Sequence, residues 1–174
     1  MNAHSAPEKT VFDFRSATPA AWQLVNDDVM GGVSLSSFQI TNGWAVFGGE
    51  VSLANNGGFA SVRSRPARLD LGDAVTFVIR VRGDGRRYKF TARMDPGFDR
   101  AIYQCAFTTK PGEWAEHRLP VKDFAASFRG RRLTDGPPLR PVDVTSVGFL
   151  IADKQAGPFQ LDLAWIKTSS SRGN

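Results

Sequence analysis

A period of two in the large apolar residues of the run at 74–82 constrains the fold of this chain more than any other feature. Successive side chains of a β-strand point to opposite faces, so a period of two is typical of a strand with one buried face. The apolar face of this run carries Val75, Phe77, Ile79 and Val81. A helix would scatter these side chains around its axis, and the run therefore predicts a half-buried strand.

A hairpin is predicted directly after this run. The turn Gly83-Asp84-Gly85 ends it, and residues 87–93 then alternate between apolar residues and Arg, Lys or Thr. Two such runs joined by a short glycine-containing turn are typical of a β-hairpin. The pair is expected to have one apolar face and one basic face.

Similar runs predict an all-β chain with about ten short strands, which is typical of a β-sandwich or barrel. Short helical turns are expected only at 18–24 and 121–128. The remaining strands are expected at 10–14, 37–41, 44–47, 51–53, 59–63, 101–108, 113–119, 144–151 and 158–167.

Size and composition favour one domain over residues 10–168, with flexible termini at 1–9 and 169–174. At 174 residues, with 41% hydrophobic residues, the chain can bury a core without disulfides or metals. The single Cys105 has no internal partner, and residues 1–10 lack the apolar core of a signal peptide. We therefore expect a cytoplasmic protein without membrane insertion. Its net charge of +5 favours anionic partners only weakly.

The inventory of reactive side chains argues against an enzyme. His4 lies in the N-terminal segment and His117 in a predicted strand, so nucleophilic catalysis has no well-placed base. One Cys and two distant His cannot form a zinc site, and we predict neither a metal nor a cofactor. Paired carboxylates leave one alternative, a glycosidase that uses Asp27 with Asp28, or either of them with Asp153. The same aspartates could instead cap turns or hold a calcium ion.

Three polar, glycine-rich loops stand out between the strands. They read VNDDVMGGVS at 25–34, NNGGFASVRS at 55–64 and ADKQAGPFQLD at 152–162. Asn and Gly tolerate positive φ, so turn formation competes with ligand binding as their explanation. The arginine cluster at 128–133, FRGRRL, suits either an acidic partner or a solvated surface. No aromatic RNA-binding motif is present, and we predict no nucleic-acid partner.

These segments together resemble the complex I intermediate-associated proteins, a family with a mitochondrial assembly factor for respiratory NADH dehydrogenase. The resemblance covers residues 10–168 and joins the three loops, in the family's order, to the segments GDGRRYKF, LPVKDF, FRGR and SVGFLIADKQ. It implies a jelly-roll β-sandwich of the galactose-binding-like type. It also implies a non-enzymatic, chaperone-like assembly protein whose partners are respiratory complex I subunits or assembly intermediates.

The resemblance also carries over a set of candidate residues for binding a ligand or partner. We expect the three loops to gather them into one polar surface at an end or on a concave face of the sandwich. The alternative is a module that binds carbohydrate or another small polar ligand, with Trp44 or Trp114 as an aromatic platform, although both are expected in the core. The candidates are Asn26, Asp27, Asp28, Ser34, Asn55, Asn56, Arg63, Arg93, Gln104, Arg129, Asp153, Lys154 and Gln155.

Overall fold

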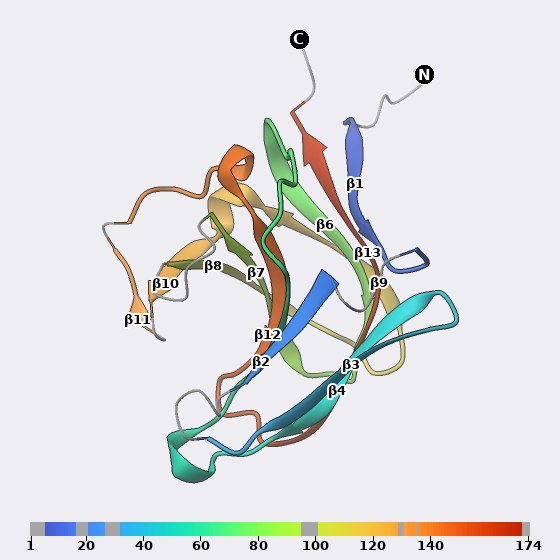
Figure 1. Cartoon of the computed structure of the whole chain (residues 1–174), viewed down its shortest axis with the longest axis vertical. Helices are drawn as coiled ribbons and strands as arrows, with labels where there is room; N and C mark the ends of the chain where they lie inside the picture. The colour runs from blue at the N-terminus through green and yellow to red at the C-terminus, as the bar shows by residue number, and fades with distance from the viewer. Residues whose placement is uncertain are drawn as a thin grey trace.

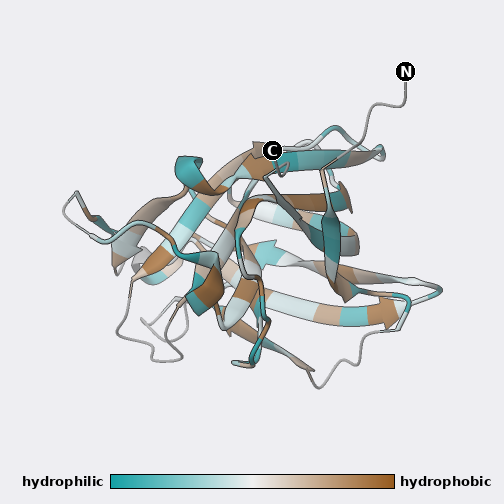
Figure 2. Cartoon of the chain, turned by 90° about the horizontal axis from the view of Figure 1, so that it is seen from above, coloured by the Kyte–Doolittle hydropathy of each residue, from teal (hydrophilic) through white to brown (hydrophobic). Residues whose placement is uncertain are grey.

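The alternating runs form strands that assemble into two antiparallel sheets facing each other (Figure 1). The computed structural model describes residues 6–16, 21–26, 32–94, 101–128, 131–134 and 136–171, and these form thirteen strands. Along the strands, hydrophobic and hydrophilic residues alternate (Figure 2), as expected when one face of each sheet is buried.

The first sheet contains six strands in the order β3-β4-β13-β6-β9, with β1 also paired to β13. The long strand β13 holds it together, because β4 pairs with residues 157–163 and β1 with residues 165–169 of the same strand. The bounds are β1 Glu8–Asp13, β3 Leu35–Thr41, β4 Trp44–Val51, β6 Ala74–Arg82, β9 Trp114–Pro120 and β13 Gly157–Ser170.

The second sheet contains seven strands in the order β11-β10-β8-β7-β12-β5-β2. Its bounds are β2 Trp22–Asn26, β5 Ala60–Ser64, β7 Arg87–Arg93, β8 Ile102–Thr108, β10 Ala125–Phe128, β11 Arg131–Arg132 and β12 Ser146–Ile151. Three short 3-10 helices complete the described part of the chain: η3 Ala54–Asn56, η4 Val121–Asp123 and η5 Pro141–Asp143.

The predicted hairpin between residues 74–82 and 87–93 is wrong. Strand β6 pairs with β13 and β9, whereas β7 pairs with β8 and β12, so the turn at Gly83–Gly85 carries the chain from one sheet to the other. The apolar faces of the two strands still meet, but across the core. Phe77 and Phe90, for example, lie 5.0 Å apart between ring centroids.

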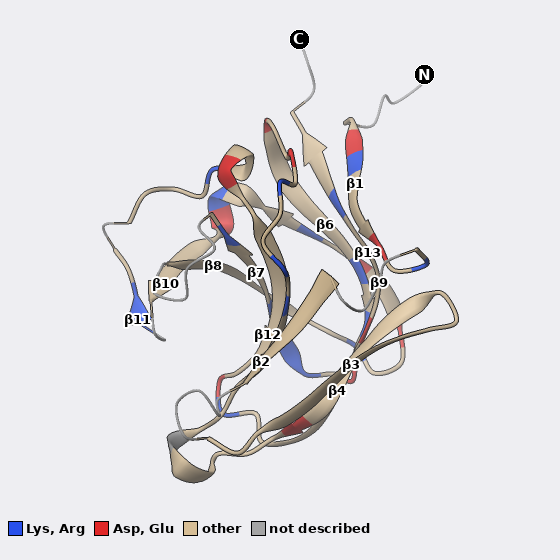
Figure 3. Ribbon diagram, in the orientation of Figure 1, with Lys and Arg blue, Asp and Glu red and all other residues tan. Residues whose placement is uncertain are grey.

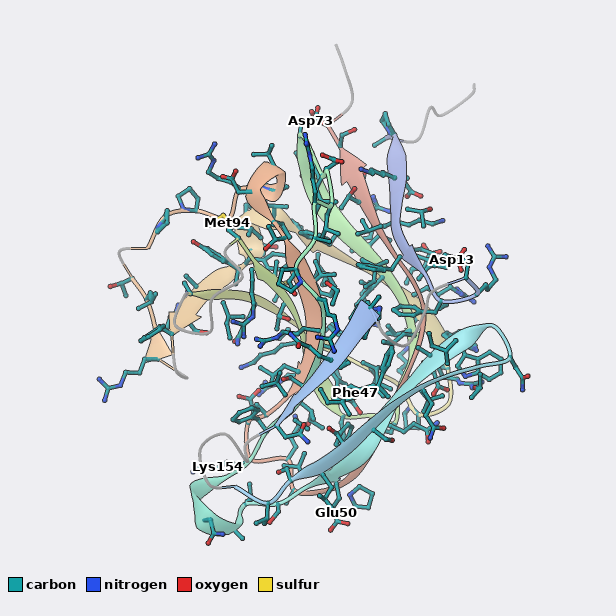
Figure 4. All side chains as sticks on the ribbon, viewed as in Figure 1. Asp13, Phe47, Glu50, Asp73, Met94 and Lys154 are labelled. Atoms are coloured by element: carbon teal, nitrogen blue, oxygen red, sulfur yellow. The ribbon has the colours of Figure 1, made fainter. Side chains whose placement is uncertain are left out.

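The core lies between the sheets and is rich in phenylalanine. Phe47, Phe77, Phe90 and Phe149 are fully buried, and Phe47 lies in the middle of the sandwich (Figure 4). Aromatic rings bury a large apolar area and gain further from edge-to-face contacts. This layer holds the sheets at a fixed distance and leaves their outer faces for other roles.

Two short helical predictions are corrected by the structure. Residues 22–26 form strand β2, although residues 17–20 lie outside the described part of the chain. Trp22 packs against Phe12 and Phe38, with ring centroids 5.0 Å and 5.5 Å away, and this burial outweighs the local preference for a turn. The helical turn expected at 121–128 ends at Asp123, and β10 follows it. Of the strand expected at 51–53, only Val51 lies in a strand, as the last residue of β4.

The crossover between the sheets is organised by the carboxylate of Asp84. Its oxygens accept hydrogen bonds from the hydroxyl of the buried Tyr88 (3.0 Å) and from the backbone N–H groups of Arg86 (3.1 Å) and Gln160 (2.9 Å). Tyr88 belongs to β7 and Gln160 to β13, so one side chain ties the two sheets together. Removing it would leave partly buried donors without an acceptor.

We therefore expect Asp84→Ala to lower the free energy of unfolding by about 1.5–3 kcal/mol, the range for hydrogen bonds to a charged group. Urea denaturation followed by tryptophan fluorescence measures the loss. Asp73→Ala is the matched control because Asp73 is an exposed aspartate on a turn, where such changes have little effect. Equal stability of the two variants would contradict the assigned role of Asp84.

Candidate functional site

Described residues of the three polar loops lie at one end of the sandwich, away from the ends of β1 and β13 nearest the termini (Figure 1). Asn26 at the end of β2 pairs with Ala60 at the start of β5, and Ala60 pairs with Ile151 at the end of β12. Lys154, which follows β12, lies at the same end (Figure 4). The antiparallel pairing of three strands thus brings segments together that are distant in sequence. Asp27 and Asp28 lie outside the described residues.

Two of the candidate residues fix the loops to the six-stranded sheet. The side-chain oxygen of Asn26 accepts a hydrogen bond from the hydroxyl of Ser36 (2.7 Å). The hydroxyl of the buried Ser34 donates to the carbonyl of Ser52 (3.3 Å) and accepts from its N–H (3.0 Å). These contacts join the chain before β3 to the chain after β4 and have a structural role.

Gln155 and Asp153 anchor the β12–β13 turn to the start of β7. The amide of Gln155 accepts a hydrogen bond from the backbone N–H of Arg87 (3.0 Å) and donates to the carbonyl of Arg87 (2.7 Å). Asp153 forms ion pairs with Arg87 (2.9 Å) and Lys89 (3.3 Å). Although partial burial acts to raise it, the pKa of Asp153 is lowered because the charge of Lys89 and hydrogen bonds from both cations favour the carboxylate.

The exposed candidate residues at this end lie where the backbone turns. Asn55 in η3 and Lys154 after β12 are exposed and have φ values of 56° and 58°. Asn adopts this left-handed conformation more readily than most residues, whereas Lys does so rarely. Asn56 also belongs to η3, but its side chain is not among those that the structure describes.

A second group of candidates lies on the outer face of the seven-stranded sheet. Arg63 pairs with Gly148 across β5 and β12, and Gly148 pairs with Thr91 of β7. Thr91 pairs in turn with Gln104 of β8. Paired residues share a face, so these four form one row across four strands. Arg93 lies two residues beyond Thr91 and points to the same side.

The two arginines of this face lie unusually deep for cations. Arg63 is 7% exposed, and burial lowers its pKa. The pKa of Arg93 is lowered to about 10 by burial and then by the positive charge of Arg63. Nη1 of Arg93 is buried and has no hydrogen-bond partner among the described residues. Both guanidinium groups stay charged at neutral pH, so like charges share a partly desolvated site.

Lys89, Thr91 and Gly148 belong to this face but were not among the predicted candidates. The alternation of residues 87–93 already assigned Lys89 and Thr91 to a polar face. It could not show which strands lie beside that face, because pairing depends on residues far away in the chain. Arg129, a predicted candidate, lies outside the described residues.

Trp44 and Trp114 are partly exposed on the outer face of the six-stranded sheet, and the expectation that both are in the core is wrong. Their rings lie 6.2 Å apart, and the guanidinium carbon of Arg82 lies 5.4 Å and 4.8 Å from the two centroids. Arg82 also pairs with the buried Asp162 (2.7 Å). Trp44 precedes the inward-facing Ala45, so alternation points its ring outward.

The described residues contain no group of three His, Cys, Asp or Glu that could hold a metal ion. His117 faces the core against Phe107, with ring centroids 5.0 Å apart, and burial lowers its pKa. A search of the described helices finds none with the length and apolar character needed to span a membrane.

The sequence model of the family described as Complex I intermediate-associated protein 30 matches residues 12–163. The mitochondrial protein of that name from Mus musculus is 33% identical over 106 residues, which are 59% of this chain and 32% of the relative. The protein from Drosophila melanogaster is 28% identical over 181 residues, 90% of this chain and 61% of the relative. The chain therefore spans less than two thirds of either relative.

Among solved structures, the family 11 carbohydrate-binding module of the cellulosomal cellulase Lic26A-Cel5E of Clostridium thermocellum has a TM-score of 0.74 at 15% identity, covering 98% of both chains. A family 29 carbohydrate-binding module, CBM29-2, has a TM-score of 0.54 at 10% identity, covering 95% of this chain and 87% of the module. These likenesses show the fold alone. They confirm the predicted jelly-roll sandwich of the galactose-binding-like type.

The ion pairs of the β12–β13 turn predict a pH dependence of stability. We expect Asp153→Asn to be less stable than the natural protein at neutral pH, because Arg87 and Lys89 lose their partner. The pKa of Asp153 in the folded chain lies below its usual value of about 3.9. Its contribution to the free energy of unfolding is therefore fully present above about pH 3.9. This contribution is lost as the pH falls through the folded-state pKa.

Thermal unfolding of both proteins from about pH 7 to about pH 3 tests this pH dependence. The difference in Tm should shrink toward the acidic end. Asp73→Asn serves as the control, because Asp73 makes no ion pair with any described residue. A difference between Asp153→Asn and the natural protein that stays constant over the whole range would count against the ion pairs.

Proposed function

We propose that this chain, which belongs to the Complex I intermediate-associated protein 30 family, is a non-enzymatic binding protein of the assembly-factor type. The single observation that carries this proposal is the family match, which extends over residues 12–163 and so includes strands of both sheets. Its partners would be protein segments, such as subunits or assembly intermediates of respiratory complex I.

The architecture supports a binding role because it offers a surface that is already ordered. Asp153 and Gln155 hold the β12–β13 turn on β7, and the aromatic core fixes the sheet beneath Arg63 and Arg93. A partner that docks on such a surface loses little free energy in ordering it. Arg63, Arg93 and Gln104 are the proposed contact residues on the sheet, with Asn55 and Lys154 at the adjoining end.

The described residues also suit a protein without catalytic chemistry. His117 faces the core, and Asp153 is occupied by two ion pairs, so neither is placed to act as a general base. Cys105 is partly buried, and burial followed by the charge of Asp123 raises the pKa of its thiol, which disfavours a reactive thiolate. A cytoplasmic location is part of this proposal, whereas the relatives are named as mitochondrial proteins.

Carbohydrate binding is the second candidate function, and the shared fold with carbohydrate-binding modules favours it. Sugar-binding surfaces commonly use aromatic rings as platforms. The aromatic residues of β7, β8 and β12, such as Tyr88, Phe90 and Phe149, face the core. Partly exposed rings are present instead on the six-stranded sheet, where Arg82 lies over both Trp44 and Trp114.

Affinity purification from native cells tests the assembly function. We expect the natural protein to capture complex I subunits and Arg63→Gln/Arg93→Gln to capture at least about tenfold less, since two charged hydrogen-bond donors are lost. Arg68→Gln/Arg118→Gln is the matched control because both arginines are exposed, and it should capture as much as the natural protein. Absence of complex I subunits in every pull-down would reject the function.

Isothermal titration with a β-1,3-1,4-mixed-linked tetrasaccharide tests the second candidate. We expect no binding at about 1 mM sugar, where a weak Kd would still give measurable heat, because the guanidinium group of Arg82 already lies over the rings of Trp44 and Trp114. Binding that is lost in Trp44→Ala would instead establish a carbohydrate site on the six-stranded sheet.

A further inference from the structure

The two sheets differ sharply in charge. The described strands of the six-stranded sheet carry five acidic and five basic residues: Glu8, Asp13, Glu50, Glu116 and Asp162 against Lys9, Arg80, Arg82, Arg118 and Lys167. The described strands of the seven-stranded sheet contain no Asp or Glu. Their basic residues are Arg63, Arg87, Lys89, Arg93, Arg131 and Arg132. The ribbon shows this contrast in the colours of the two layers (Figure 3).

Most of these basic side chains belong to one surface. Arg87, Lys89 and Arg93 alternate with the core residues of β7, and the row through Gly148 places Arg63 on the same face. At the end of the sheet, Arg87 and Lys89 both form ion pairs with Asp153, whose single negative charge offsets part of theirs. Arg93, farther along β7, has no ion pair with any described residue.

The burial of Arg93 is costly for the folded chain. A guanidinium group that loses water without gaining an acceptor pays a desolvation penalty, and the neighbouring charge of Arg63 adds repulsion. Its Nη1 is buried with no acceptor among the described residues. The carbon atoms of an apolar side chain could cover the same surface without this penalty. The arrangement is therefore explained by a role outside the folding of the chain itself.

The residues between the long side chains are small. Gly148 lies between Arg63 and Thr91 in the row, and a Cβ atom built on it would lie 2.3 Å from the carbonyl oxygen of Val62. No larger side chain fits there without moving the backbone. Thr91 is short, and Gln104 follows on the next strand. The guanidinium groups are thus bordered by a hydroxyl and an amide, both of which can donate hydrogen bonds.

We propose that this face binds an oxyanion, a carboxylate or phosphate group of the ligand, between Arg63 and Arg93, with Thr91 and Gln104 donating further hydrogen bonds. The planar fork of arginine donates two parallel hydrogen bonds to such groups, and a bound anion would compensate the shared positive charge. The inference rests on the proposed binding function and names the chemistry that the partner must present.

Titration of the purified chain with sodium phosphate and with glutarate tests the site, each against sodium chloride at equal ionic strength. We expect Tm to rise with at least one of the two anions, since a ligand that binds only the folded state stabilises it. A response to phosphate alone identifies a phosphate group, and a response to glutarate identifies a carboxylate. Isothermal titration then gives the Kd.

Arg93→Met should weaken anion binding at least about tenfold, as expected for the loss of a charged donor. Arg118→Met, on the other sheet, should bind like the natural protein. Without anion, Arg93→Met should be no less thermally stable than the natural protein, because it removes a buried charge. A second variant, Arg93→Lys, keeps the charge but loses the planar fork, and it should also bind about tenfold more weakly.

The proposal is overturned if neither anion raises Tm beyond sodium chloride, or if all variants respond equally. A marked loss of stability in anion-free Arg93→Met would also overturn it, because Arg93 would then serve the fold. The anion titration uses the purified chain alone. A negative result in it is therefore distinguishable from a negative result in the affinity purification. Anion binding without capture of complex I subunits would reject the assembly function and leave the site intact.

Discussion

Burial of one face of every sheet against the other is the constraint on which the rest of this structure depends. Because side chains alternate along a strand, the residues that enter the core determine which residues face outward. Phe90 and Ala92 point inward on β7, and this places Lys89, Thr91 and Arg93 together on the outer face. The composition of the candidate binding face is thus set by the packing of phenylalanine residues behind it.

The polar residues of the loop segments divide into two roles. Asp84, Gln155 and Ser34 satisfy backbone groups and hold crossovers and turns in place. Such contacts stabilise the folded chain and order these segments. Arg93 differs, because partial desolvation and repulsion by the positive charge of Arg63 oppose its placement. A residue that costs stability in the free protein is a stronger indication of binding than one that a local hydrogen bond explains.

The likeness to carbohydrate-binding modules separates fold from function. A jelly roll supplies two sheets and a set of loops, and its outer faces can carry very different chemistry. In this chain one face carries partly exposed tryptophans with Arg82 lying over them, and the other carries arginines that alternate with core aromatics. The charge and shape of these surfaces distinguish the two candidate functions, which the shared backbone cannot do.

The sequence by itself determined most strands, the all-β class and the family, because alternation and motif order are local properties of the chain. It placed Lys89 and Arg93 on a basic strand face, but it could not show that Arg63 lies close by. Only the tertiary structure decided that β6 and β7 belong to opposite sheets, that Trp22 enters a strand and that Trp44 faces outward. Each of these outcomes depends on pairing between residues far apart in the chain, where burial of large side chains outweighs local preference.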